Sequence, residues 1–296
     1  MYQITLGNIV IVVGLAALTR GFYLFFKFVY TYIRPSSIMK YRTSGAYAVV
    51  TGATDGIGKA IALELADKGF NLVLHGRSAD KLLSVSREVL EINPALQVRF
   101  IIHDSSINNP TDISALQKLP IRVLVNNVGV GPIKAFPEFS TAEIDSTVNV
   151  NILFPTHLTN ILLPYLSGPA LILNISSYAG IHPPPYLAVY AATKAYNDAF
   201  SKSLSVELGD VETISILTGS VHTGSNSKPV SFLRPSSQVF ARKVLGIVGC
   251  GKKSVMPYWP HAVQTYFLSL LPERMMDRAM KNAMRKEVEA ASKSGA

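Results

Sequence analysis

The sequence has little cysteine, little charge and no clustered metal ligands. Its single cysteine, Cys250, excludes an intrachain disulfide and fits a reducing compartment. Only 16% of the 296 residues are charged and 48% are hydrophobic, whereas about 25% are charged in an ordinary soluble domain. This composition excludes a disordered chain. The six histidines are scattered and the basic residues form no long run, so neither a metal site nor nucleic-acid binding is predicted.

Acidic residues are absent from the first 44 positions, which contain five basic ones. These basic residues are Arg20, Lys27, Arg34, Lys40 and Arg42. The net charge of the whole chain is +9, but residues 45–260 hold 17 basic and 15 acidic residues and are nearly neutral. The largest positive excess therefore lies at the N-terminus, beside the most apolar stretch of the chain.

The N-terminal segment is long and apolar enough to predict a membrane anchor. Residues 4–18 are uncharged and mostly aliphatic, and an aromatic stretch follows over residues 21–33. A span needs about 20 apolar residues, which the two stretches supply together. The first three residues carry no positive charge and no cleavage site is evident, so the anchor is expected to stay on the chain. A hairpin within one leaflet and an interfacial helix are the alternatives. The basic residues that follow predict a cytoplasmic location for the remainder.

The rest of the chain alternates short apolar runs with amphipathic stretches, the pattern of a parallel sheet covered on both faces. The predicted strands are Ala46–Thr51, Asn71–His75, Val98–Ile102, Arg122–Val125, Ala170–Ile175, Thr213–Leu217 and Ser254–Met256. The predicted helices include Ile57–Lys68, Ala79–Ile92, Thr141–Leu166 and Ala188–Leu208. We therefore predict an α/β fold with a Rossmann-type doubly wound sheet of about seven strands.

Three parts of the chain are expected. Residues 1–44 form the anchor and a juxtamembrane linker, residues 45–260 form the catalytic domain, and residues 261–296 form a C-terminal helical extension. Within this extension, the apolar run 266–271 precedes a methionine-rich amphipathic stretch. A helix packed on the core or on a second copy is one interpretation, and a second membrane contact is the other.

A glycine-rich turn follows the first predicted strand and opens a helix. Gly52, Gly56 and Gly58 let the backbone turn tightly and approach a pyrophosphate at the helix N-terminus. Thr54, Asp55 and Ile57 lie in the same turn. Lys59 is followed by alanine, which argues against a nucleotide-triphosphate loop. The turn therefore predicts dinucleotide binding.

The end of the second predicted strand indicates which dinucleotide is bound. An acidic residue there would hold the ribose hydroxyls of NAD, but the sequence has Arg77 and Ser78 instead. Arg77 is suited to pair with a 2′-phosphate, to which Ser78 would add a hydrogen bond. NADPH and NADP⁺ are therefore the predicted cofactors.

Ser177, Tyr190 and Lys194 are the residues predicted to carry the chemistry. Tyr190 and Lys194 are four residues apart on a predicted helix, so both face the same way. A free tyrosine has a pKa of about 10, and we expect the nearby ammonium to lower the pKa of Tyr190 so that it acts as an acid or base near neutral pH. Ser177 follows a buried strand, where its hydroxyl is suited to hold a carbonyl oxygen.

These motifs, in this order, resemble the short-chain dehydrogenase/reductase family over about residues 45–290. The resemblance rests on Thr51–Gly58, Asn126–Gly129, Asn151, Asn174–Ser177 and the Tyr190 and Lys194 pair. It implies that Asn151, Ser177, Tyr190 and Lys194 form a catalytic tetrad, in which Asn151 holds a water that returns a proton through Lys194. It also implies cofactor contacts for Tyr190 and Lys194 and for Asp104, Asn127, Gly129, Val221 and Thr223. Thr218 stands where the family has a proline.

Within that family, the details are similar to the membrane-bound very-long-chain 3-oxoacyl-CoA reductases and the 17β-hydroxysteroid dehydrogenases of types 3 and 12. The resemblance implies NADPH-dependent reduction of a ketone on a lipophilic substrate, first of all a 3-oxoacyl-CoA in fatty acid elongation. A steroid or retinoid ketone and a membrane-tethered scaffold without turnover are the alternatives. It further implies an endoplasmic reticulum membrane location with a single N-terminal anchor, and leaves a homodimer or elongation-complex partners open.

Overall fold

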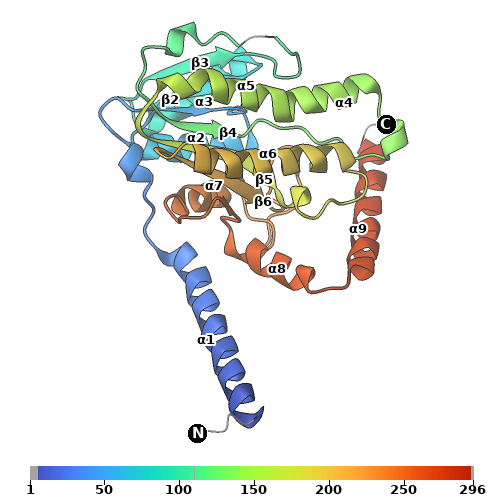
Figure 1. The fold of residues 1–296 in the computed structure, drawn as a ribbon. Coiled ribbons are helices and arrows are strands. Elements are labelled where there is room, and N and C mark those ends of the chain that lie inside the picture. The colour runs from blue at the N-terminus through green and yellow to red at the C-terminus, as the bar shows by residue number, and fades with distance from the viewer. Residues whose placement is uncertain (1–5, 110, 295–296) are drawn as a thin grey trace.

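The computed structural model describes residues 6–109 and 111–294. Its centre is a seven-stranded sheet in the order β3-β2-β1-β4-β5-β6-β7, in which every neighbouring pair is parallel (Figure 1). The strands are β1 (Tyr47–Val50), β2 (Asn71–Gly76), β3 (Val98–Ile102), β4 (Ile121–Asn126), β5 (Leu166–Ser177), β6 (Val211–Thr218) and β7 (Ser254–Val255). The reversal of strand order between β1 and β4 is that of a doubly wound Rossmann-type fold, as the sequence predicts.

The alternation of side chains along β1 shows why both faces of the sheet are covered. Ala48 and Val50 belong to one buried cluster, to which α2 and α3 also contribute. Tyr47 and Val49 belong to the other, which lies under α5. Each of these strand residues is at most 3% exposed. A strand that is buried on both faces has to be apolar throughout, and this accounts for the short apolar runs of the sequence.

Helices cover the two faces of the sheet and continue the chain beyond it. Near the sheet lie α2 (Gly56–Asp67), α3 (Ala79–Ile92), α4 (Thr141–Val148), α5 (Phe154–Leu162), α6 (Ala188–Glu207) and α7 (Ser237–Gly246). The C-terminal part consists of α8 (Trp259–Ser269) and α9 (Glu273–Ser294). Short turns complete the path: η1 (Ile38–Tyr41), η2 (Ser114–Leu116), η3 (Phe136–Glu138), η4 (Asn149–Leu153), η5 (Leu163–Tyr165) and η6 (Tyr178–Gly180).

One predicted helix is interrupted. The stretch 141–166 is continuous in pattern, but the structure divides it at η4, a π-helical segment at Asn149–Leu153. Pro155 follows directly and lacks the N–H that a regular helical hydrogen bond requires. Such π-segments occur often at functional sites, and this one contains Asn151. The pattern of apolar residues does not reveal it because it remains helical across the interruption.

Helix α1 (Leu6–Ile33) projects away from the body of the molecule (Figure 1). It is one continuous helix, which disagrees with the alternative of a hairpin. Among the described residues it is the one helix long and apolar enough to cross a membrane, and its most apolar window is not buried by any other part of the chain. An N-terminal apolar helix of this kind could anchor the protein in a membrane.

The end of α1 is fixed to the body. The hydroxyl of Tyr32 donates to the carbonyl of Met256 at 3.0 Å, and both terminal nitrogens of Arg34 donate to the carbonyl of Val248 at 3.0 Å. Ile38 and Tyr41 follow and are 2% and 1% exposed within the core. Part of the predicted linker is therefore core structure, and Arg34 caps backbone carbonyls as well as supplying charge.

The C-terminal helices leave apolar side chains uncovered around the turn between α8 and α9. Tyr266, Phe267 and Leu270 are each more than 60% exposed, and Met275 is 56% exposed. In Figure 1 this turn lies on the side of the body from which α1 projects. Helix α9 then runs back along the body, where Met276 is buried.

Candidate active site

The glycine-rich turn connects β1 to α2. Asp55 caps the helix, because its carboxylate accepts a hydrogen bond from the N–H of Gly56 at 2.6 Å. A Cβ atom at Gly58 would lie 2.3 Å from the carbonyl oxygen of Gly52 and from the amide nitrogen of Asn127, so only glycine fits there. The side chain of Asn127 donates to the carbonyls of Thr51 and Gly52. The turn thus leaves the N-terminus of α2 open to a pyrophosphate.

The residues expected at the adenosine end gather beside the ends of β2 and β3. A Cβ atom at Gly76 would lie 2.8 Å from the methyl carbon of Thr54, so the turn touches the strand that leads to Arg77. Arg77 is exposed, and its charge contributes to lowering the pKa of Asp104, although the main cause is hydrogen bonding from Ser106. The hydroxyl of Ser78 accepts the backbone N–H of Lys81 and caps α3.

Ser177, Tyr190 and Lys194 lie together where β5 ends against α6. The hydroxyl of Ser177 donates to the backbone carbonyl of Thr218 at 3.4 Å, and it acts on the phenol of Tyr190 as a nearby hydrogen-bonding group. The ammonium nitrogen of Lys194 lies 5.6 Å from the centre of the Tyr190 ring. Ser177 also accepts the N–H of Ala179 at 3.1 Å, which fixes its rotamer. A carbonyl oxygen placed beside these two hydroxyls would receive two hydrogen bonds, as a developing alkoxide requires.

The expected lowering of the Tyr190 pKa is wrong for this structure. Burial raises the pKa of Tyr190 because the phenolate loses its hydration, and the hydrogen bond from Ser177 offsets this only in part. Burial also lowers the pKa of Lys194 to about 8. The desolvation of both groups is the physical reason for the difference.

Asn151 lies at the bend of the interrupted helix and is fully buried. Its side-chain oxygen accepts the N–H of Val130 at 2.9 Å, and its amide donates to the carbonyl of Val130 at 2.8 Å. The amide also donates to the hydroxyl of Thr193 at 2.9 Å. Asn151 therefore ties η4 both to the loop after β4 and to α6, one residue before Lys194.

A cavity of about 910 Å³ joins the glycine-rich turn to Tyr190. Ten of the residues predicted from the sequence line it: Gly52, Asp55, Gly56, Ile57, Asn127, Gly129, Tyr190, Lys194, Val221 and Thr223. Asn151 and Ser177 are not part of this lining. Asn151 is hydrogen-bonded to Val130, which lines the cavity, and Ser177 acts on the lining residue Tyr190. Thr54, Gly58, Arg77, Ser78 and Asp104 lie outside its lining. The volume is sufficient for the reactive half of a dinucleotide and part of a substrate.

An unpartnered hydroxyl supports a ligand in this cavity. The side-chain oxygen of Thr218, the residue in place of the family's proline, is buried and has no hydrogen-bond partner within the described chain. It lines the same cavity. A buried hydroxyl without a partner is costly, and an amide-bearing ring in the cavity would satisfy it. The residues present therefore fit a nicotinamide dinucleotide.

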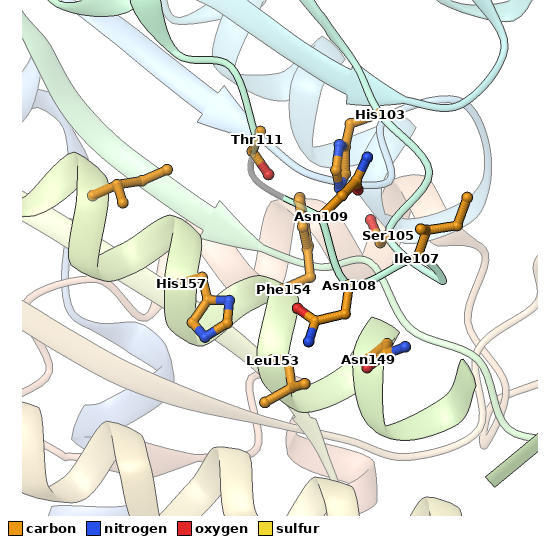
Figure 2. A pocket seen from close by; sticks show the side chains of 11 residues that line it. His103, Ser105, Ile107, Asn108, Asn109, Thr111, Asn149, Leu153, Phe154 and His157 are labelled. Carbon is orange, nitrogen blue, oxygen red and sulfur yellow. The ribbon is translucent and has the colours of Figure 1, made fainter. Parts of the chain in front are cut away.

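A second cavity, of about 300 Å³, lies between the loop after β3 and the helical segments η4 and α5 (Figure 2). His103 and Phe154 face it, and their rings are stacked with centres 5.4 Å apart. None of the predicted site residues lines it. It is therefore separate from the site built around Tyr190.

Residues 46–231 match the short chain dehydrogenase family. The chain belongs to the short chain dehydrogenase family. As a member of it, the protein is an oxidoreductase, and family members use NAD or NADP.

The curated relatives divide between two kinds of substrate. A very-long-chain 3-oxoacyl-CoA reductase of Anas platyrhynchos is 37% identical over 255 residues, which cover 80% of each chain. A Caenorhabditis elegans protein that carries the name steroid dehydrogenase 1 on a provisional basis is 34% identical over 280 residues, 90% of this chain and 88% of that one. Among solved structures, a 7β-hydroxysteroid dehydrogenase superposes with a TM-score of 0.72 at 19% identity, covering 80% of this chain and 96% of that one.

The sequence of this short chain dehydrogenase does not predict a role for two residues that support the site, Asn126 and Thr193. Asn126 joins the central strands, because its amide donates to the side-chain oxygens of Asn174 at 2.8 Å and of Thr159 at 2.9 Å. Thr193 links Asn151 to α6. A polar residue inside an apolar strand is a signal for Asn126, whereas nothing in the pattern distinguishes Thr193. Ser176 also lines the cavity, but its hydroxyl is engaged, because it donates to the backbone carbonyl of Lys194 at 2.7 Å.

Proposed function

We propose that the protein reduces the ketone of a very-long-chain 3-oxoacyl-CoA to the 3-hydroxyacyl-CoA in fatty acid elongation, with NADPH as the reductant. The observation that carries the proposal is the single cavity that joins the glycine-rich turn to Tyr190 and Lys194, with Ser177 close enough to act on the Tyr190 phenol. The names of relatives that are 32–37% identical support the acyl-CoA class.

The chemistry requires one hydride and one proton. NADPH, when bound, supplies the hydride that the carbonyl carbon accepts. The hydroxyls of Ser177 and Tyr190 donate hydrogen bonds to the carbonyl oxygen, so that negative charge develops there against two oriented dipoles. Tyr190 then transfers its phenolic proton to this oxygen, which completes the alcohol.

Lys194 and Asn151 support this proton transfer. The ammonium of Lys194 would stabilise the phenolate that remains on Tyr190 and would bind the ribose hydroxyls. Asn151 holds Val130 and Thr193 in place with three hydrogen bonds, and its side-chain oxygen retains acceptor capacity for the water that returns the proton through Lys194.

The choice of NADPH over NADH rests on Arg77. No acidic residue directly follows β2, and the exposed guanidinium of Arg77 would bind a 2′-phosphate with a charge-assisted hydrogen bond. Ser78 caps α3 and keeps its second lone pair and its hydrogen for the same phosphate.

The proposed location is the endoplasmic reticulum membrane, with α1 as the single anchor and the catalytic domain on the cytoplasmic side. The uncovered apolar surface of α1 supports an anchor, and the basic residues after it support the orientation. A lipophilic substrate would then meet an enzyme held at the surface of the membrane in which it dissolves.

A steroid ketone is the second candidate substrate, because one relative carries a steroid dehydrogenase name over 90% of this chain. The deciding experiment measures NADPH oxidation by the detergent-solubilised full-length protein with a panel of 3-oxoacyl-CoA chain lengths and a panel of steroid ketones. Higher kcat/KM on the acyl-CoA panel is expected. Higher kcat/KM on the steroids would refute the proposal, and no turnover with any ketone would indicate a scaffold.

A further inference from the structure

Two cations line the part of the active-site cavity that faces α9. Lys228 and Arg234 belong to the segment between β6 and α7, and both line the cavity together with Met284 and Glu287 of α9. They lie close enough for the charge of Arg234 to contribute to lowering the pKa of Lys228, after the larger effect of burial. Glu287 forms an ion pair with Lys228.

Arg234 is held in place by the loop that carries it. Its Nε donates to the hydroxyl of Ser220 at 2.9 Å, and one terminal nitrogen donates to the carbonyl of Pro229 at 3.3 Å. A pair of backbone hydrogen bonds between Ser231 and Arg234 closes the turn. Within the described residues these contacts leave the second terminal nitrogen, Nη2, available to a ligand. A guanidinium fixed in this way presents its donors at little cost in side-chain entropy.

The cofactor does not account for these cations. Its pyrophosphate is provided for by the N-terminus of α2 at Gly56, and its 2′-phosphate by Arg77 at the end of β2. Lys228 and Arg234 come from a different segment and share their stretch of the cavity with α9. The substrate part of the cavity thus has two cations and one carboxylate, an excess of positive charge that a neutral steroid does not require.

We propose that Lys228 and Arg234 bind the phosphate groups of the substrate's coenzyme A moiety, and that Glu287 forms its ion pair with Lys228 when no phosphate is present. The inference rests on the proposed function and names the residues that select an acyl-CoA over a neutral ketone. Phosphate oxygens accept from guanidinium and ammonium groups in short charge-assisted hydrogen bonds. Glu287 then competes with the substrate, since the ion pair with Lys228 has to open for a phosphate to bind.

The test compares two thioesters of the same 3-oxoacyl chain, one on coenzyme A and one on N-acetylcysteamine, which has no phosphate. The full-length proteins R234Q and K228Q are assayed in detergent with saturating NADPH. We expect each change to raise KM for the coenzyme A thioester about tenfold, with kcat and the N-acetylcysteamine thioester unaffected. E287Q should lower KM for the coenzyme A thioester. K118Q, which removes an exposed lysine outside the cavity lining, is the matched control.

Three results would overturn the assignment: equal losses on the two thioesters, no loss on either, or a rise in KM for NADPH in place of the thioester. Binding of free coenzyme A to the NADPH-saturated protein is measured by calorimetry as an arm independent of turnover. Wild-type binding that is lost in R234Q supports the site even if the proposed reaction fails, and absence of wild-type binding refutes it. Failure of the reaction itself is seen separately, as no turnover of either thioester by the wild-type protein.

Discussion

The ammonium nitrogen of Lys194 lies 2.8 Å from the backbone carbonyl oxygen of Ile175. This hydrogen bond joins α6, which carries Tyr190, to β5, which carries Ser177. Lys194 is 4% exposed, so its ammonium group is poorly hydrated. This burial lowers its pKa to about 8. One lysine therefore connects the position of the reacting groups with the stability of the fold.

Stability should rise with pH because of this lysine. Between pH 8 and 10 the unfolded chain keeps its proton on Lys194, since a free lysine has a pKa of about 10.4, while the folded protein releases it. The unfolded state then binds more protons, so the free energy of unfolding increases with pH, by at most about 1.4 kcal/mol per pH unit. Urea unfolding at several pH values should show this slope in the wild type, and K194M should lose it. Equal slopes in the two proteins would contradict the assignment.

Removing the Tyr190 hydroxyl should abolish catalysis and spare cofactor binding. Y190F keeps the ring and loses the proton donor, so we expect turnover to fall by about 10²–10⁴-fold. Fluorescence titration should show NADPH binding within a factor of two of the wild type, about 0.4 kcal/mol. Y196F, an exposed tyrosine on the same helix, serves as the control and should keep full activity. Near-normal reduction by Y190F would refute the proposed role.

Arg77 should determine the preference between the two dinucleotides. R77A loses a charge-assisted hydrogen bond to the 2′-phosphate, which is worth about 1.5–3 kcal/mol, so KM for NADPH should rise about 10- to 150-fold. KM for NADH should not rise, because NADH has no phosphate at that position. R87A, which removes an exposed arginine of α3, should change neither. A parallel loss with both cofactors would show that Arg77 acts on the fold instead.

Two truncations should behave differently although both remove residues 6–29 of α1. Deletion of residues 1–29 keeps Tyr32 and Arg34, and the melting temperature should stay close to that of the full chain. Deletion of residues 1–44 also removes Ile38 and Tyr41 from the core, at a cost of several kcal/mol since one large buried side chain accounts for about 2–5 kcal/mol. Thermal unfolding would detect the difference, and equal melting temperatures would show that residues 30–44 do not support the body.

Much of the fold follows from the sequence because the signals are local. The apolar runs of β2 and β3 and the periodicity of α3 give their positions to within one residue. The interruption at Asn149–Leu153 does not follow, because it depends on hydrogen bonds from Asn151 to residues 21 and 42 positions away in the chain. The docking of Arg34 on Val248 is missed for the same reason.

The site shows the same division. The spacing of Tyr190 and Lys194 places them on one face of a helix, which the structure confirms. The pKa of Tyr190 depends on how much water the folded chain excludes, and no pattern of residues reports that quantity. The ion pair of Lys228 with Glu287 also joins segments 59 residues apart, so only the fold reveals it.

The hydrogen bonds between Arg34 and Val248 couple the orientation of the proposed anchor α1 to that of the catalytic body. Gly249 lets Ser37 and Arg34 approach its backbone more closely than any side chain would allow, so the end of α1 is packed tightly against the body. A long helix adapts to a thinner bilayer by tilting, and a rigid joint passes that tilt on to the whole catalytic body. The thickness of the membrane would then set the height at which the cavity beside Tyr190 faces the lipid surface, and with it the part of a long acyl chain that reaches the reacting groups.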